Sequence, residues 1–335
     1  MDDLNIRTSG RAGRITFTRP KALNALSHDM ALAIHRALDG WRDDPQVELV
    51  VIDAEGDRAF CAGGDIAAVY RAGLAGDHAT GQRFFADEYR MNAAIADYPK
   101  PIVAFMQGFV MGGGVGVGGH ASHRIVGDTT QIAMPESGIG LIPDVGGTWL
   151  LSRAPGRIGE YLALTGARMG AGDAIHAGFA DTYIPETQWP DLIARLETTG
   201  DPTLIEGEDA PTASLKTSDL SPFARDSVAD IIDALEQHGD AQTLKILNAN
   251  SPLSMAAGLT MVRAARGDQR MQDSLAREYR FTWRATRDTD FLEGVRAQII
   301  DKDRKPRWTA DASPAHVAAL LAPLGPHELT WRVDA

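Results

Sequence analysis

The sequence predicts an α/β fold followed by a helical C-terminal region. Apolar segments of strand length alternate with amphipathic segments of helical spacing through about residue 190. A polar stretch without periodicity runs from Thr199 to Ser221, and strand signals are few beyond it. These observations divide the chain into a core over residues 1–200, a linker over residues 201–222 and a helical region over residues 223–335.

The first elements of the core read strand, helix, strand. Arg14–Thr18 is a short strand that ends at Arg19-Pro20, and the apolar spacing over Met30–Trp41 predicts a helix. Glu48–Asp53 has the apolar character of a buried strand and is closed by Gly56. This alternation is the basis of the α/β assignment.

The rest of the core is richer in turns. The turn-rich segment Ala59–Ile66 precedes a helix over about Gln82–Ala96. The strand Pro101–Met106 leads to a run of glycines, and His123–Gly127 and Gln131–Met134 are further short strands. In the C-terminal region, amphipathic helices are expected over Phe223–His238, Leu253–Arg266 and Asp273–Arg287.

Charge and cysteine content exclude several classes of function. A formal net charge of −12 disfavours a nucleic-acid or anionic membrane surface, because both need a basic patch. The single cysteine, Cys61, excludes a disulfide framework and a cysteine-based zinc site, and it fits a reducing compartment. Neither a signal-peptide core nor an apolar run of about 18 residues occurs. We therefore expect a cytoplasmic protein without metal, membrane or nucleic-acid partners.

The run Met111–His120, MGGGVGVGGH, satisfies the dinucleotide pattern G-x-G-x-x-G from Gly114. A dinucleotide site also needs a crossover helix and an acid at the end of the next strand, whereas this chain leaves room for only about two helical turns. Close helix packing is one explanation for Gly116–Gly119. Three consecutive glycines at Gly112–Gly114, at a strand-to-helix junction, instead favour a backbone that a ligand approaches.

Bare amides at a helix N-terminus can polarise a carbonyl oxygen as well as hold a phosphate. A single donor is weak, so a partner loop is expected. Ala62–Asp65, AGGD, offers small residues and exposed amides between a strand region and a helix. Two glycine loops that face one oxygen would form an oxyanion hole.

Two acids follow the glycine run, and each comes directly after a proline. Glu136 and Asp144 lie eight residues apart among apolar residues and glycines, where desolvation raises the pKa of a carboxylate toward values useful for proton transfer. Two converging carboxylates could perform acid–base or covalent chemistry. The alternatives are that Glu136 is a surface turn residue and that Asp144 caps the helix beginning near Gly146.

In the order and spacing of its motifs, the chain resembles the crotonase superfamily, also called the enoyl-CoA hydratase/isomerase family. The resemblance covers about residues 14–308 and rests on Arg19–Leu26, Ala59–Ile66, Lys100–Ala104, Met111–Gly114 and Pro135–Gly147. It implies a spiral core of ββα units, an acyl-CoA thioester as ligand, and an oxyanion hole made by the amides of Gly64 and Gly113. Members commonly form trimers or hexamers, so a homo-oligomer is expected.

Further segments are similar to the 3-hydroxyisobutyryl-CoA hydrolase branch: Phe84–Asn92, Gly112–His120, Glu278–Phe281 and Asp290–Asp303. Hydratases of the family carry a second catalytic glutamate two residues after the triple glycine, where this chain has Gly116. Hydrolases of the resembling type pair the two acids that are Glu136 and Asp144 here. The resemblance implies hydrolysis of a short branched 3-hydroxyacyl-CoA, above all 3-hydroxyisobutyryl-CoA, as in valine degradation. An enoyl-CoA hydratase/isomerase and a non-catalytic acyl-CoA-binding protein are the alternatives.

The same resemblance assigns roles to individual residues. Glu136 attacks the carbonyl carbon or activates water, Asp144 orients the substrate hydroxyl or water and can pass a proton to the thiolate, and Glu88 contacts the substrate. CoA, which is part of the substrate so that no separate cofactor is expected, would bind near Arg19 or Lys21 and along Lys21, Ala22, Leu23, Ala25, Ala62, Asp65 and Ile66.

Plainer interpretations of four residues stay open beside these roles. Glu88 is then a helix-surface carboxylate and Lys21 a turn residue. Cys61, between Phe60 and Ala62, is more simply a core thiol than a nucleophile. His120 is more simply a hydrogen-bonding residue than a catalytic one.

Overall fold

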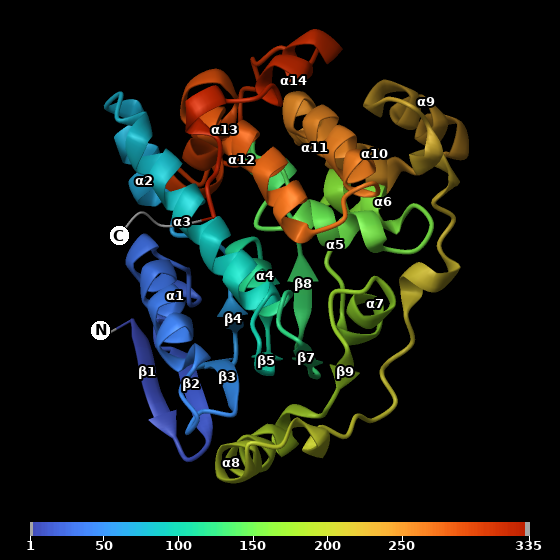
Figure 1. Ribbon diagram of the computed structural model, residues 1–335. Helices are drawn as coiled ribbons and strands as arrows, with labels where there is room; N and C mark the ends of the chain where they lie inside the picture. Colours follow the sequence, from blue (N-terminus) through green and yellow to red (C-terminus); the bar gives the residue numbers. More distant parts are fainter. Residues whose placement is uncertain (1–2, 332–335) are drawn as a thin grey trace. The chain divides into compact units, whose positions relative to one another are not determined.

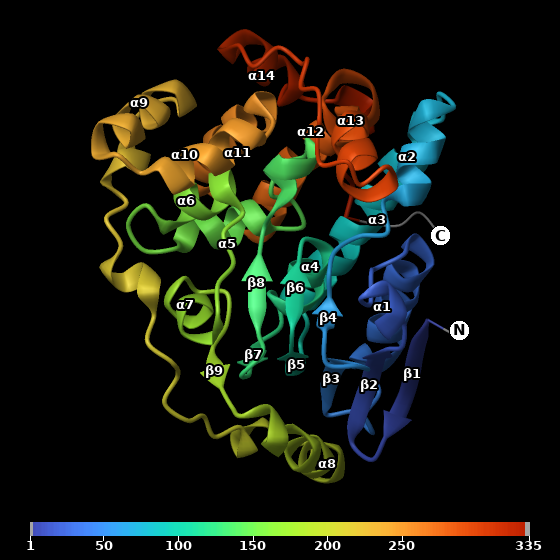
Figure 2. The same ribbon diagram turned by 180° about the vertical axis from the view of Figure 1, so that it is seen from behind.

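The computed structural model describes residues 3–331, shown from opposite sides in Figures 1 and 2. These residues form two compact units, each built from segments that are not consecutive in the chain. The first unit comprises the chain up to Asp65, Arg90–Ala133 and Arg168–Ser218; the second comprises Ile66–Tyr89, Met134–Ala167 and the chain from Asp219 onward. The expected division in chain order, at residues 200 and 222, stays a prediction.

A six-stranded sheet forms the base of the first unit, in the order β1-β2-β3-β5-β7-β9 (Figure 1). Its strands are β1 Leu4–Ser9, β2 Ala12–Phe17, β3 Leu49–Ala54, β5 Ile102–Met106, β7 His123–Val126 and β9 Thr182–Tyr183. Only the pair β1–β2 is antiparallel. Alternate residues of β3 and β5, among them Val51 and Phe105, pack with Trp189 and Leu196 of α8 (Trp189–Thr199). Val50 and Ile52, on the other face, are also fully buried. Burial on both faces explains the nearly continuous apolar runs of the parallel strands.

A second, three-stranded parallel sheet in the same unit has the order β4-β6-β8 (Figure 2). Its strands are β4 Ala59–Cys61, β6 Phe109–Met111 and β8 Gln131–Ala133. The sequence predicted only turns for β4 and gave no strand for β6, because three residues are too few to show an alternating pattern. One expectation was therefore wrong: the strand that leads to the glycine run is β6, and β5 belongs to the other sheet.

The N-terminal helix of the first unit is confirmed with small changes at its ends. α1 spans His28–Arg42, and the Ser27 hydroxyl accepts a hydrogen bond from the Met30 amide at its start. α4 (Gly113–Gly118) and α7 (Ala171–His176) are much shorter. The short α4 confirms that the glycine run does not open a long crossover helix.

The second unit is helical, as expected for the C-terminal region. It contains α2 Ala67–Leu74, α5 Gly147–Arg153, α6 Ile158–Thr165, α9 Val228–His238, α10 Ala241–Ala249, α11 Pro252–Ala265, α12 Met271–Asp288, α13 Phe291–Val295 and α14 Pro314–Leu320. α3 (His78–Ala96) begins in this unit and ends in the first one. α11 packs against α5, α6 and α12. Between residues 3 and 331, no helix is both long and apolar enough to span a bilayer.

Candidate active site

The two glycine loops follow neighbouring parallel strands of the small sheet. β4 ends at Cys61 and its partner β6 ends at Met111, so both loops leave the sheet at the same edge. Gly112 has φ 47° and ψ −116°, a conformation that side chains disfavour, and it turns the chain into α4. Gly113 is the first residue of that helix, where amides have no acceptor within the helix.

The same loops approach each other so closely that glycine is required at Gly114, whereas at Gly63 a φ of 116° is what favours glycine. A Cβ on Gly114 would lie 2.1 Å from the Cys61 carbonyl oxygen, and a Cβ on Gly63 would lie 3.6 Å from the Met111 carbonyl oxygen. Further along α4, a Cβ on Gly118 would lie 2.6 Å from the sulfur of Met106. The packing interpretation therefore holds for Gly118, whereas the first glycines bring two backbone loops together.

A third segment, residues 22–26, is bound to the first glycine loop. The Ala62 amide donates to the Leu23 carbonyl (3.0 Å), and the Asp65 amide donates to the Leu26 carbonyl (2.8 Å). These bonds occupy two of the four amides in the AGGD loop. Within the described part of the chain, the amides of Gly63 and Gly64 remain as the loop's donors for a ligand. The structure thus brings together most of the residues expected to contact CoA: Ala22, Leu23, Ala25, Ala62 and Asp65. Ile66 begins the second unit.

The two cations expected near the CoA phosphates differ in their surroundings. Arg19 donates to the Ala25 carbonyl (2.9 Å) and forms an ion pair with Asp65 at 3.3 Å. Lys21 is exposed in a 3₁₀ turn and lines a hollow of about 130 Å³ together with Arg58. Lys21 is therefore the better candidate for a phosphate, and the plain turn interpretation of this residue stays open.

The three acids expected to act on the acyl group are buried in the second unit. Glu88 on α3 is 2% exposed, and Glu136 and Asp144 are each 4% exposed. The alternatives that placed Glu88 on a helix surface and Glu136 on a surface turn were therefore wrong. Burial raises the pKa of Glu88 and of Glu136 well above the ordinary value, and repulsion from Asp144 raises both further. The structure thus brings the three carboxyl groups together.

Asp144 has a hydrogen-bond partner that the sequence did not reveal. The Tyr89 hydroxyl donates to Asp144 Oδ2 at 2.6 Å, and both side chains are buried. Burial raises the pKa of Asp144 to about 7, although the bond from Tyr89 lowers it. Asp144 does not cap α5, because the N-cap residue is Gly146 and has no side-chain cap. The capping alternative was therefore wrong.

A fourth buried acid, Glu278 on α12, lies against the same turn. Its carboxylate accepts hydrogen bonds from the Gly146 amide (2.8 Å), the Thr148 amide (3.0 Å) and the Thr148 hydroxyl. Burial raises its pKa to about 8. Sequence reasoning gave Glu278 no role, although it lies at helical spacing from the buried Leu275 and Phe281. An acid on the apolar face of a helix was the available signal.

The buried acids differ in how well their oxygens are satisfied. Glu88 Oε1 and Glu136 Oε2 are buried without a hydrogen-bond partner, and so are both amide atoms of Asn92, four residues after Glu88 on α3. Unpaired buried polar atoms are costly and few in folded proteins. No group of three or more His, Cys, Asp or Glu among residues 3–331 is arranged to hold a metal ion.

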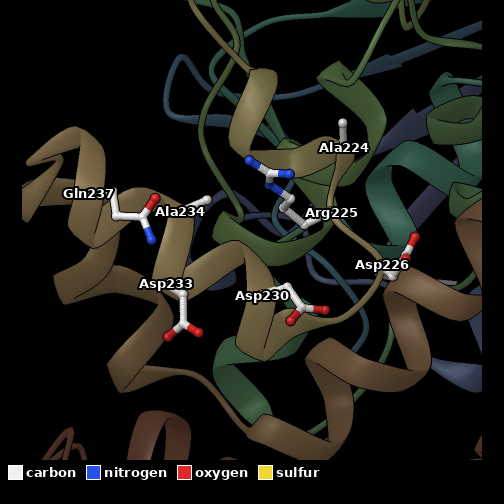
Figure 3. Close-up of a pocket in the computed structure, with 7 residues that line it drawn as sticks. All are labelled: Ala224, Arg225, Asp226, Asp230, Asp233, Ala234 and Gln237. Atoms are coloured by element: carbon white, nitrogen blue, oxygen red, sulfur yellow. The ribbon is translucent and has the colours of Figure 1, made fainter.

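Two hollows in the second unit contain none of the predicted site residues. One, of about 430 Å³, lies beside α9 and is lined by Arg225, Asp226, Asp230 and Asp233, among others (Figure 3). The other, of about 760 Å³, is mostly apolar and is lined by residues of α9, α11 and α14. Neither hollow gathers the acids described above.

Comparison with known proteins shows the family and the fold of the chain. The enoyl-CoA hydratase/isomerase family pattern matches residues 12–321. The 3-hydroxyisobutyryl-CoA hydrolase of Gallus gallus is 37% identical over 98% of this chain and 90% of its own length; that of Xenopus tropicalis is 40% identical over 90% and 83%. A crystal structure described as an enoyl-CoA hydratase from Rhodobacter sphaeroides is 56% identical, with a TM-score of 0.95 over 98% of this chain and 99% of that one. This likeness confirms the expected crotonase-type fold, and the chain belongs to the enoyl-CoA hydratase/isomerase family.

Proposed function

We propose that the protein hydrolyses the thioester of 3-hydroxyisobutyryl-CoA to the free hydroxy acid and CoA, a step of valine degradation. The observation that carries the proposal is the buried pair Glu136 and Asp144 in a chain that has Gly116 where family hydratases have their second glutamate. Adding water across a double bond needs two acid–base groups around one water, and Gly116 supplies none. The hydrolases of Gallus gallus and Xenopus tropicalis support the same activity.

In the proposed mechanism, the amides of Gly64 and Gly113 hold the thioester oxygen as it gains negative charge. Donors that are fixed before the reaction stabilise the tetrahedral intermediate without reorganising, and each contributes roughly 10²- to 10³-fold in rate. This role fits a glycine whose amide opens a helix, and a loop in which the Ala62 and Asp65 amides are already bound.

Glu136 acts on the carbonyl carbon by one of two routes. It attacks directly, so that the carbon–sulfur bond breaks and a mixed anhydride forms that water then hydrolyses; or it removes a proton from an attacking water. Asp144 orients the substrate hydroxyl or the water and passes a proton to the departing thiolate. A pKa of about 7 suits a group that must both hold and release a proton near neutrality. Glu88 contacts the substrate.

The two routes differ in where the oxygen of water goes in a single turnover. With excess enzyme in ¹⁸O-water, direct attack followed by hydrolysis at the Glu136 carbonyl carbon of the anhydride transfers one enzyme oxygen to the product and leaves ¹⁸O on Glu136. Hydrolysis at the acyl carbon would instead place ¹⁸O in the product, and borohydride trapping of the anhydride separates that case from general-base catalysis. General-base catalysis places ¹⁸O in the product from the first turnover and none on the enzyme. Mass spectrometry of the product and of the peptide containing Glu136 distinguishes them.

Hydratase activity is the second candidate, because the Rhodobacter sphaeroides protein is 56% identical and is described as an enoyl-CoA hydratase. Purified protein should be incubated separately with 3-hydroxyisobutyryl-CoA and with an enoyl-CoA, while free thiol and the conjugated alkene are followed. We expect thiol from the first substrate and no alkene loss from the second. The absence of thiol above background from several short hydroxyacyl-CoAs, with loss of alkene, would establish the hydratase instead. If no thiol is released and no alkene is lost, the result would indicate a non-catalytic acyl-CoA-binding protein.

The proposal extends to CoA, assembly and location. CoA lies along residues 22–25 and 62–66, with Lys21 near a phosphate; Lys21→Ala should raise KM and leave kcat nearly unchanged.

The protein forms a homo-oligomer, which light scattering on the purified chain tests. It acts in the cytoplasm, since one buried cysteine in 335 residues suits a reducing compartment, whereas its animal relatives are named as mitochondrial. Cell fractionation tests the location.

A further inference from the structure

Asp144 lies in a backbone turn that is unfavourable without outside support. The residue after it, Val145, has a positive φ of 54°, a left-handed conformation that is strained for a β-branched side chain. Gly146 follows with a φ of 79°, and the Gly147 amide donates to the Asp144 carbonyl at 2.6 Å. A turn of this kind persists only when neighbouring groups fix it.

Glu278 supplies that support from α12. Its two carboxylate oxygens take up the Gly146 amide and the Thr148 amide, which begin α5 and have no acceptor within it. Glu278 therefore does from 130 residues away what a local capping side chain does in other helices.

Tyr89 fixes the carboxyl group itself. Its ring is buried and packs edge-on against Tyr279, with ring centres 6.3 Å apart and planes at 80°. Its hydroxyl lies 2.6 Å from Asp144 Oδ2 and 3.3 Å from the Thr282 hydroxyl. A phenol held in this way has few other orientations. The carboxylate that accepts its hydrogen bond is therefore held in place as well.

The groups that face Asp144 from neighbouring elements are mostly acids. Glu88 and Tyr89 face it from α3, Glu136 from the turn Glu136–Ile139, and Glu278 from α12. α11 contributes an uncharged contact, with Gly258 against Pro143. Arg277, beside Glu278 on α12, interacts electrostatically with that acid. Among the described residues, no arginine, lysine or histidine is a main cause of the raised pKa values of these four acids. Hydrogen bonds from neutral donors, first the Tyr89 hydroxyl and then a backbone amide, thus favour the charged form of Asp144.

We propose that Tyr89 and Glu278 are positioning residues for Asp144, Tyr89 through the carboxylate and Glu278 through the backbone turn. The proposal rests on the proposed function only for the role of Asp144 in thioester hydrolysis. We call the two contacts, Tyr89 with the Asp144 carboxylate and Glu278 with the Gly146 and Thr148 amides, the clamp. The geometry of the clamp is independent of the reaction.

The main test is a double-mutant cycle in the full-length chain with Tyr89→Phe, Asp144→Asn and the two combined. Tyr89→Phe alone should lower kcat for thiol release roughly 10- to 100-fold, the range for a hydrogen bond to a charged group, with little change in KM. On the Asp144→Asn background the same change should have almost no further effect, because Tyr89 acts through Asp144. Equal losses on both backgrounds would overturn the proposal.

The pH profile gives a readout that a purely structural role would not move. The bond from Tyr89 lowers the pKa of Asp144, so Tyr89→Phe should shift the limb of the kcat profile that belongs to Asp144 to higher pH. Tyr279→Phe is the matched control, since it removes the hydroxyl of the adjoining buried ring, which lies 3.4 Å from the Gln82 carbonyl oxygen. An equal shift in the Tyr279 variant would attribute the effect to packing and refute the assignment.

Glu278→Gln tests the backbone part of the clamp. Glutamine keeps one acceptor, while its NH₂ group cannot accept from Gly146 or Thr148. We expect a lower kcat, an unchanged KM and normal CoA binding; a KM effect with unchanged kcat would contradict a role in the Asp144 turn.

Carboxyl NMR of ¹³C-labelled aspartate separates the clamp from the function. In protein without any thiol-releasing activity, Tyr89→Phe should still move the Asp144 titration to higher pH, and an unmoved titration would refute the clamp alone.

Discussion

The glycine loops of the first unit and the buried acids of the second unit are built in different ways. The loops are backbone structures: Gly112 turns the chain by its dihedral angles, and Gly114 is required because Cys61 leaves no room for a Cβ. The acids are side-chain structures, in which Asp144 depends on Tyr89 and on a helix far along the chain. The first kind of site is specified by local residue types and the second by tertiary packing.

The difference also separates stability from chemistry. The contact of Gly114 with the Cys61 carbonyl lets two backbone segments pack, so this glycine serves folding, and the proposed function makes the neighbouring Gly113 amide an oxyanion donor. Glu136 and Glu88 instead carry buried oxygens without partners, which cost stability. The proposed function gives both acids a role that offsets this cost. Changes at the loops should therefore harm folding and activity together, whereas changes at the acids should separate them.

The largest expected effect is that of Glu136→Gln. Removing an acid–base or nucleophilic carboxylate should lower thiol release by at least about 10²- to 10⁴-fold. The free energy of unfolding should stay equal or rise, because a buried carboxyl group with an unpaired oxygen becomes a neutral amide. Steady-state kinetics and urea unfolding measure the two quantities on one preparation. Activity close to that of the wild type would remove Glu136 from its role.

Glu160 on α6 provides the matched control, since it is a buried acid of the same unit with cationic partners. It is fully buried and pairs with Arg157 at 2.9 Å, Arg266 at 2.8 Å and Arg263 at 3.6 Å. Glu160→Gln should lower the free energy of unfolding by on the order of 3 kcal/mol and leave kcat of the folded protein nearly unchanged. The two variants should therefore have opposite effects: Glu136→Gln loses activity and keeps stability, whereas Glu160→Gln loses stability and keeps activity.

Gly114→Ala tests the other side of the comparison. Because a Cβ there would lie 2.1 Å from a backbone oxygen that cannot rotate away, α4 or β4 must shift. We expect a loss of about 1–3 kcal/mol in the free energy of unfolding, together with lower kcat, since the Gly113 amide moves with the helix. Calorimetry and kinetics check this. A stable variant with full activity would show that the close approach is not required.

The part of the site that could be predicted from the sequence follows the same division. Gly112–Gly114 and the strand Leu49–Ala54 have local signatures, and Glu136 and Asp144 were visible as acids after prolines among apolar residues. The Tyr89–Asp144 bond joins residues 55 positions apart, and the Glu278–Thr148 bond joins residues 130 apart. No periodicity reports such pairs, because they exist only once the helices pack. The sequence did not predict β4 and β6 for a different reason: each strand is only three residues long, too short to show an alternating pattern.

A moderate effect is expected in how stability depends on pH. Burial raises the pKa of Glu278 in the folded protein to about 8, above the ordinary value of 4.5, so between these pH values the folded state binds more protons than the unfolded state. The stability that this group contributes is fully present below pH 4.5 and is lost as pH rises through about 8. Glu278→Gln should make this decline shallower by at most about 1.4 kcal/mol per pH unit. Urea unfolding at several pH values measures the slope, and an unchanged slope would mean that Glu278 is ionised throughout.

The smallest effect is expected at Cys61, where a reactive residue type lies in the backbone-built region. Its side chain is fully buried at the end of β4, and its thiol lies 3.6 Å from the Gly63 carbonyl oxygen. A hydroxyl can make the same contact but is a far weaker nucleophile, so Cys61→Ser separates packing from chemistry. If the first unit contributes only amides, thiol release should stay within about threefold of the wild type, the scale of a small core adjustment. A loss of several hundredfold with normal unfolding behaviour would make Cys61 a nucleophile and would end the division between a backbone-built unit and a side-chain-built one.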